Sequence, residues 1–194
     1  MNTKHVEELW REILIEIREN PDRKGLKDTP HRIAKMYKEL FRGYNKQKLP
    51  KVTTFDNGTD GIGYDEMICD EGTFYSQCEH HVIPFFGKYY FAYIPNPNGK
   101  ILGLSKVARV VDHFSAKLQI QERLVHEIVE YLWEALCKDA EEHEPLGMAL
   151  VMKGEHLCKT MRGAKKKGQM TCSVMKGNFK DNPQTKQEFL NLIK

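Results

Sequence analysis

The chain has 194 residues, 40% hydrophobic and 29% charged, a composition typical of one globular domain rather than of a disordered segment. Its 30 Lys and Arg against 27 Asp and Glu leave a net charge of +3, an excess too small to indicate a nucleic-acid partner. No apolar run approaches the roughly 20 residues of a membrane span, and five cysteines without a secreted-domain pattern predict reduced thiols in a cytoplasmic protein with no membrane partner.

The first 45 residues predict two helices. An apolar stripe at helical spacing covers residues 5–19, and a proline follows it. Thr29, followed by proline, predicts the start of the second helix. Arg32 and Lys35 lie three residues apart on this helix, away from its apolar stripe. We therefore expect a helical N-terminal arm over residues 1–45.

The rest of the chain alternates short β-rich runs with helices. The predicted strands are Val52–Phe55, Glu66–Cys69, Thr73–Tyr75, Tyr89–Ile94, Met148–Met152 and Met170–Met175. Two helices are expected between the fourth and fifth strands, one capped by Ser105 and one over residues 120–136, and Asn182 opens a final helix. Two strand pairs flanking two helices predict an α+β fold with an antiparallel sheet, as one unit over residues 46–194.

The densest group of metal donors is the Cys-Glu-His-His run at residues 78–81. Thiolate and neutral imidazole are the preferred zinc ligands, but such a run alone is equally consistent with a buried cysteine beside exposed imidazoles. His156 and Cys158 add two donors that share one face if this segment is a strand. Two Cys/His clusters in one reduced chain favour a metal site.

A catalytic zinc site uses three protein ligands and keeps one open position. Two cysteines and three histidines exceed that number, which leaves imidazoles for proton transfer. The spacing leaves open which histidine faces Cys78. A straight strand would direct His80 to the same side, and a turn would direct His81 there.

Basic and polar pairs suggest further contacts. Lys106 and Arg109 lie at a helix start, where the dipole also favours anions, although scattered basic residues usually form a solvated face. Arg162 follows the second Cys/His cluster and could join them. Gln121 and Glu122 place an amide beside a carboxylate, a pair able to read the edge of guanine. Taken alone, that pair is better explained as helix surface.

Together these motifs resemble the zinc-dependent GTP cyclohydrolase I family. The matching stretches are DRKGLKDTPHRIAKMYKELFRGY, SQCEHHVIPFFGKYYFAYIPN, GLSKVARVV, LQIQERL, EHLCKTMRGAKK and TCSVMKGNF. They follow one another in the family's order and cover most of the chain. The resemblance implies the tunnelling fold, in which two strand pairs pack around two helices, and a homo-oligomer, a toroidal decamer with active sites between subunits.

The resemblance also implies roles for individual residues. The implied zinc ligands are Cys78, His81 and Cys158; the implied proton-transfer and ribose-rearranging residues are His80, His156 and Ser105; the implied triphosphate and ribose contacts are Arg32, Lys35, Lys106, Arg109 and Arg162; and the implied guanine contacts are Gln121 and Glu122. The implied substrate is GTP. The implied reaction opens its imidazole ring, releases formate and rebuilds the rings as 7,8-dihydroneopterin triphosphate, in pterin and tetrahydrofolate biosynthesis.

One departure from the family pattern and two competing functions remain. Ala116-Lys117 stand where the family typically carries arginine; Lys117 keeps the charge but not the planar fork, which predicts a weakened contact. A tunnelling-fold protein that binds a purine or pterin without this chemistry would not need the zinc ligands. A structural zinc module would need a fourth protein ligand, for which Cys69 and Cys172 are the spare thiols considered.

Overall fold

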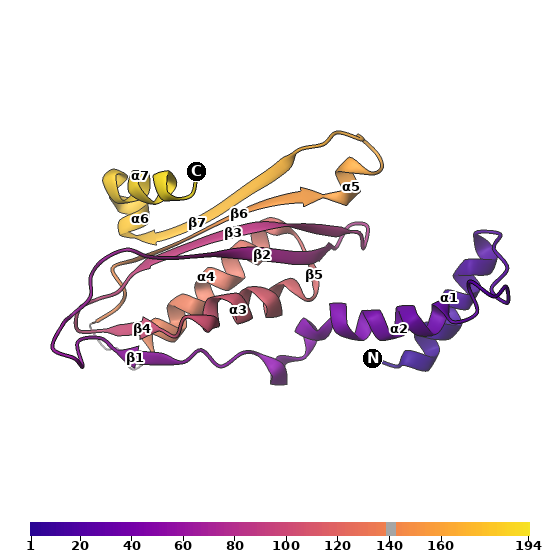
Figure 1. Ribbon diagram of the computed structural model, residues 1–194, viewed down its shortest axis with the longest axis horizontal. Coiled ribbons are helices and arrows are strands. Elements are labelled where there is room, and N and C mark those ends of the chain that lie inside the picture. The colour runs from indigo at the N-terminus through magenta and orange to yellow at the C-terminus, as the bar shows by residue number, and fades with distance from the viewer. Residues whose placement is uncertain (139–142) are drawn as a thin grey trace.

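The computed structural model describes residues 1–138 and 143–194, and two helices extend from one end of a long sheet (Figure 1). The helices are α1 (Thr3–Glu16), α2 (Thr29–Leu40), α3 (Ser105–Ser115), α4 (Gln121–Cys137), α5 (Leu157–Thr160), α6 (Asn178–Asp181) and α7 (Pro183–Leu192), with 3₁₀ turns at Arg42–Tyr44 and Lys46–Lys48. The strands are β1 (Thr54–Asp56), β2 (Ile68–Cys78), β3 (Pro84–Ile94), β4 (Lys100–Leu102), β5 (Leu118–Gln119), β6 (Gly147–His156) and β7 (Gln169–Gly177). The predicted α+β class is confirmed.

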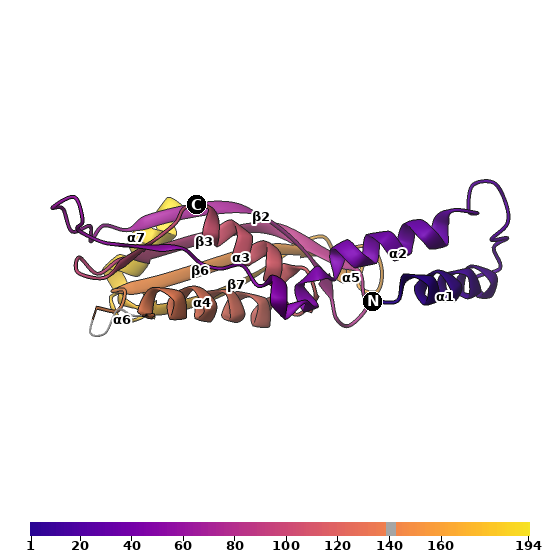
Figure 2. The same ribbon diagram turned by 90° about the horizontal axis from the view of Figure 1, so that it is seen from below.

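Helices α1 and α2 pack on each other and project away from the sheet (Figures 1 and 2). Trp10 of α1 meets Tyr37 of α2 edge-on, with ring centroids 6.1 Å apart. The first helix ends at Glu16, earlier than its apolar stripe predicts. Arg18 adopts a left-handed φ of 65°, which stops the helix before the proline that was expected to end it.

Five strands form the main sheet in the order β5-β2-β3-β6-β7. The neighbouring pairs β2–β3, β3–β6 and β6–β7 are all antiparallel, as expected for two joined strand pairs. The two-residue strand β5 adds a parallel pairing with β2, so the sheet is mixed rather than wholly antiparallel. Strands β1 and β4 form a separate small sheet.

Strand β2 is continuous where the sequence predicted two short strands. Gly72 interrupts the β-rich pattern, but the strand needs a glycine there. A Cβ at Gly72 would lie 2.7 Å from the ring of Tyr89, which covers this position from β3. The Tyr89 hydroxyl donates a hydrogen bond to the Asp70 carboxylate at 3.1 Å, which fixes the ring over the glycine.

The sheet buries both faces, in the period-two pattern that a strand imposes. Phe91 and Leu150 belong to the core beneath α3 and α4, whereas their neighbours Ala92 and Val151 belong to a second core beneath α6 and α7. Figure 1 shows the two helix pairs on opposite faces of the sheet. Among the described residues, the structure contains no helix both long and apolar enough to span a membrane.

Candidate active site

A tight turn joins β2 to β3 and carries the Cys-Glu-His-His run. The Cys78 carbonyl accepts a hydrogen bond from the Val82 amide at 2.8 Å, and the Cys78 amide donates to the Ile83 carbonyl at 3.0 Å. Val82 has a φ of 54°, a costly left-handed conformation for a β-branched residue. The turn therefore separates a buried Cys78 from the exposed side chains of His80 and His81.

The end of β6 lies beside this turn. The register of β3 and β6 pairs Phe85 with His156, and Cys158 follows in α5. As a result, the Sγ atoms of Cys78 and Cys158 lie 3.8 Å apart, and ligand atoms of Cys78, His156 and Cys158 all lie within 4.8 Å of one another. Two thiolates on one tetrahedral zinc, with bonds of about 2.3 Å, would also be separated by about 3.8 Å. The donor set and the sulfur spacing fit a zinc ion.

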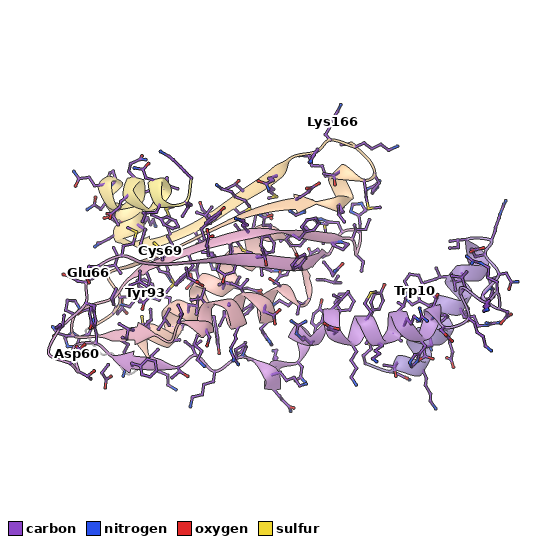
Figure 3. The ribbon with its side chains drawn as sticks, in the orientation of Figure 1. Trp10, Asp60, Glu66, Cys69, Tyr93 and Lys166 are labelled. Carbon is purple, nitrogen blue, oxygen red and sulfur yellow. The ribbon has the colours of Figure 1, made fainter. Side chains whose placement is uncertain are left out.

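The spare thiols do not complete a closed, four-ligand site. Cys69 is the second residue of β2 and lies at the other end of the sheet from the turn (Figure 3). Cys172 pairs with Met152 on β6, four residues before His156, or about 13 Å along the strand. Neither of the spare thiols considered for a closed site therefore lies beside the cluster.

Burial governs protonation in this cluster. Burial raises the pKa of the Cys158 thiol, and the adjacent Cys78 thiol raises it further. Burial lowers the pKa of His156, while the nearby Glu122 carboxylate acts in the opposite direction. Metal binding would therefore displace thiol protons, and His156 is neutral near pH 7.

The two exposed histidines have different neighbours. His80 Nδ1 lies 3.6 Å from Cys78 Sγ, and His81 Nε2 lies 2.8 Å from Nη1 of Arg162. One end of the sheet therefore brings together eight of the predicted residues. They are Cys78, His80, His81, Gln121, Glu122, His156, Cys158 and Arg162. Gln121 is fully buried there, and Glu122 is exposed.

The remaining predicted residues lie far from this cluster within one chain. Ser105, Lys106 and Arg109 begin α3, and the preceding Leu104 lines a cavity of about 300 Å³ with residues 68–70 at the start of β2. Cys78 is at the opposite end of that strand, and its 11 residues span about 33 Å. Arg32 and Lys35 are exposed on α2, in the arm.

The sequence analysis did not identify the residues that support the turn between β2 and β3. The guanidinium of Arg123 contacts the Glu79 carboxylate, and its Nε donates to Gln119 Oε1 at 2.8 Å. Lys117 pairs with Glu127 at 2.9 Å. The sequence shows an acidic residue, Glu79, and a basic residue, Arg123, in two separate motifs, but only the fold shows that these two side chains are in contact.

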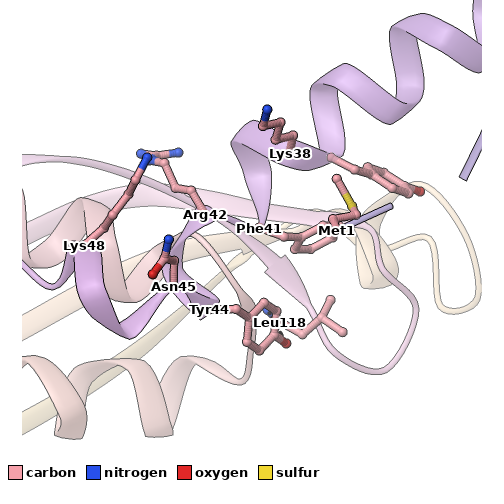
Figure 4. A pocket seen from close by; sticks show the side chains of 9 residues that line it. Met1, Lys38, Phe41, Arg42, Tyr44, Asn45, Lys48 and Leu118 are labelled. Atoms are coloured by element: carbon pink, nitrogen blue, oxygen red, sulfur yellow. Dashed lines mark hydrogen bonds between the residues drawn. The ribbon is translucent and has the colours of Figure 1, made fainter. Parts of the chain in front are cut away.

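A separate cavity of about 630 Å³ lies where α2 joins the sheet (Figure 4). Its lining includes Tyr37, Phe41, Tyr44 and the basic residues Lys38, Arg42 and Lys48. None of the predicted site residues lines it. Arg42 is paired with Asp112, so part of this basic character is neutralised within the chain.

Comparison with known proteins identifies the family. The GTP cyclohydrolase I family matches residues 6–194. The chain belongs to the GTP cyclohydrolase I family. It is 41% identical over 194 residues to GTP cyclohydrolase 1 of Streptococcus agalactiae serotype Ia, covering 99% of this chain and 97% of that one. It is 42% identical over 193 residues to GTP cyclohydrolase 1 of Streptomyces avermitilis, covering 98% and 90%.

A solved structure, that of the archaeosine synthase QueF-Like in its apo form, is 15% identical. It covers 57% of this chain and 93% of that chain, with a TM-score of 0.41, a value too low to support an argument about the fold. The assignment to the GTP cyclohydrolase I family rests on the sequence matches.

Proposed function

We propose that this chain is a GTP cyclohydrolase that converts GTP to formate and 7,8-dihydroneopterin triphosphate. Water adds to the imidazole carbon between the two ring nitrogens, both carbon–nitrogen bonds of that carbon are hydrolysed, and formate leaves. Opening consumes two waters; the rearranged ribose, now a ketone, then condenses with the freed amine on the pyrimidine, which closes the new ring and releases one water. The pairing of Cys78 and Cys158 at 3.8 Å beside His156, in a chain of this family, is the observation that carries the proposal.

The two thiolates would hold a zinc ion, with His81 as the third ligand, as the family resemblance implies. The His81 amide lies 3.4 Å from the Cys78 carbonyl, so the two residues belong to one tight turn, which also contains His80. A zinc ion bound there supplies Lewis-acid activation of water. In this structure the histidine grouped with the two thiols is His156, whereas His81 Nε2 lies 2.8 Å from Arg162 Nη1, so a third ligand at His81 requires its ring to turn away from Arg162. The zinc content of His81→Ala and His156→Ala would distinguish the two histidines.

The chain's own groups would handle protons and substrate. Neutral His156 can accept a proton as the ring opens, and the exposed His80 can exchange protons with solvent. Glu122 would accept hydrogen bonds from the guanine edge. Arg162, Lys106 and Arg109 would bind the triphosphate, with Arg32 and Lys35 as further contacts and Ser105 assisting ribose rearrangement.

These roles require more than one chain. About 33 Å of β2 separates the thiol cluster from the start of α3, so a neighbouring copy would supply Ser105, Lys106 and Arg109 to each site. Strand β7 is an edge of the sheet, open to pairing with another chain. We infer a tunnelling-fold oligomer, a decamer, with residues 1–45 as its arm and residues 46–194 as its catalytic domain.

Substitution of one thiol tests the function. Cys158→Ser should lose bound zinc and reduce formate release from GTP by more than about 100-fold, because a zinc-activated water is lost. Purified, zinc-loaded protein would be incubated with GTP while formate and the pterin chromophore are followed, with and without a chelator. Cys172→Ser is the matched control and should keep both zinc and turnover. Retained turnover in Cys158→Ser would exclude Cys158 as an essential ligand.

A further inference from the structure

Gln121 is fully buried, and its side-chain amide is oriented by the chain itself. Its Nε2 lies 2.9 Å from the Met152 carbonyl and 3.0 Å from the Met170 carbonyl. Both carbonyls can only accept, so the nitrogen must face them and donate both of its hydrogens. Its oxygen, Oε1, is thereby directed to His156, whose Nε2 lies 2.9 Å away.

This orientation selects one tautomer of His156. An amide oxygen can only accept, so Nε2 of His156 must carry the proton, and the lone pair of the neutral ring belongs to Nδ1. Phe85 stacks on the same ring, with centroids 4.5 Å apart and planes inclined by 7°. The stacking limits ring tilt, and the hydrogen bond limits ring rotation.

Strand β6 leaves room for the contact between Gln121 and His156. A Cβ on Gly154 would lie 2.6 Å from Gln121 Oε1, so β6 carries no side chain where the amide oxygen must sit. The same burial leaves the Gln121 side chain with no exposed surface for a substrate base. Glu122, the next residue, is exposed and close enough for its charge to act on His156.

We propose that Gln121 is a positioning residue that holds His156 as its Nε2–H tautomer with Nδ1 available for proton transfer, and that Glu122 alone of this pair reads the guanine base. The inference rests on the proposed function, since it assigns roles within that site. It divides the amide and the carboxylate that the sequence motif places side by side. One acts on a catalytic histidine, and the other acts on the substrate.

Measurements of GTP binding and of turnover distinguish the role of Gln121 from that of Glu122. Gln121→Met should lower kcat by about 10–100-fold with little change in the KM for GTP. Glu122→Gln, the matched comparison, should instead weaken GTP binding by about 10-fold or more, because it removes a charged hydrogen-bond acceptor. It should also reduce discrimination against inosine triphosphate, which lacks the exocyclic amino group. Weakened GTP binding and lost discrimination in Gln121→Met would overturn the assignment.

A double-mutant cycle with His156→Ala tests whether Gln121 acts through His156. In the zinc-loaded His156→Ala oligomer, adding Gln121→Met should change neither residual turnover nor the Kd for GTP or inosine triphosphate. Additive losses would overturn the proposal. Gln121→Glu keeps the shape but places a carboxylate oxygen against the Met152 and Met170 carbonyls, which only accept, so it should not restore turnover, whereas discrimination should stay unchanged. A wild-type protein that releases no formate would instead refute the proposed function, which separates the two failures.

Discussion

Glu79 lies between Cys78 and His80, and its carboxylate pairs with the guanidinium of Arg123. Arg123 binds it while also donating to Gln119 Oε1 at 2.8 Å and to the Leu118 carbonyl at 3.1 Å. These contacts tie the exposed side of the turn to β5 and α4. The strained φ of Val82 is therefore held by a network behind the turn as well as by the turn's own hydrogen bonds.

His113 gives the protein a pH-dependent stability. Burial lowers the pKa of His113, and the charges of Lys117 and Arg42 lower it further, whereas Asp112 opposes them. The unfolded chain binds a proton near pH 6.5, while the folded chain resists it. The contribution to stability is therefore complete above pH 6.5 and is lost as the pH falls toward the lower pKa of the folded state.

We expect His113→Gln to flatten the decrease in unfolding free energy between pH 7.5 and 5.5, measured by urea denaturation. The difference between variant and wild type at pH 8, where the imidazole is neutral in both states, measures the packing change and serves as the control. An unchanged slope would contradict the assignment to His113.

The sequence indicated which residues could bind a metal or transfer protons, but not how their side chains are arranged in space. The donor types at residues 78–81 and at His156 and Cys158 indicated a metal site before any fold was known. The partner of Gln121 could not be predicted, because its three contacts come from β6 and β7, more than 30 positions away. A motif places Gln121 beside Glu122, but burial gives the two side chains different surroundings.

At the scale of elements, periodicity predicted the long helices and misjudged the strands. Helices α3 and α4 begin within one residue of their expected starts, because their apolar stripes face the sheet. Strand β3 begins at Pro84 rather than Tyr89, since ladder pairing with β2 and β6 overrides its weak local pattern. Short helices such as α5 have too few residues for a periodic signal.

The continuity of β2 depends on Gly72. We expect Gly72→Ala to destabilise the protein by about 1–3 kcal/mol, because the new methyl group would meet the Tyr89 ring at 2.7 Å. Thr73→Ala, on the exposed side of the same strand, is the control and should change stability by no more than about 0.5–1 kcal/mol. Thermal unfolding of both variants tests this, and equal melting temperatures would show that the ring moves aside without cost.

At the scale of the whole molecule, the proposed site residues of the sheet domain fall into two groups at opposite ends of one sheet. The thiol cluster lies where β2 ends, and the basic start of α3 lies beside the place where β2 begins. Leu104, which immediately precedes Ser105, is 80% exposed, an unusual position for a leucine beside a catalytic candidate. The separation of the two groups and the exposure of Leu104 are both explained if a second chain covers Leu104 and brings its own thiol cluster to Ser105.

Mixed oligomers test this arrangement. Lys106→Met and Cys158→Ser chains should each be nearly inactive alone, the first because phosphate binding is lost and the second because the metal is lost. Co-expressed in equal amounts with different affinity tags and purified through both, they should recover about a quarter of wild-type turnover, since random pairing leaves that share of interfacial sites with an intact cluster and an intact Lys106. Mixing the purified homo-oligomers without subunit exchange is the control and should recover none. Absence of recovery in the co-expressed protein would mean that each site draws both halves from one chain, which the length of β2 argues against.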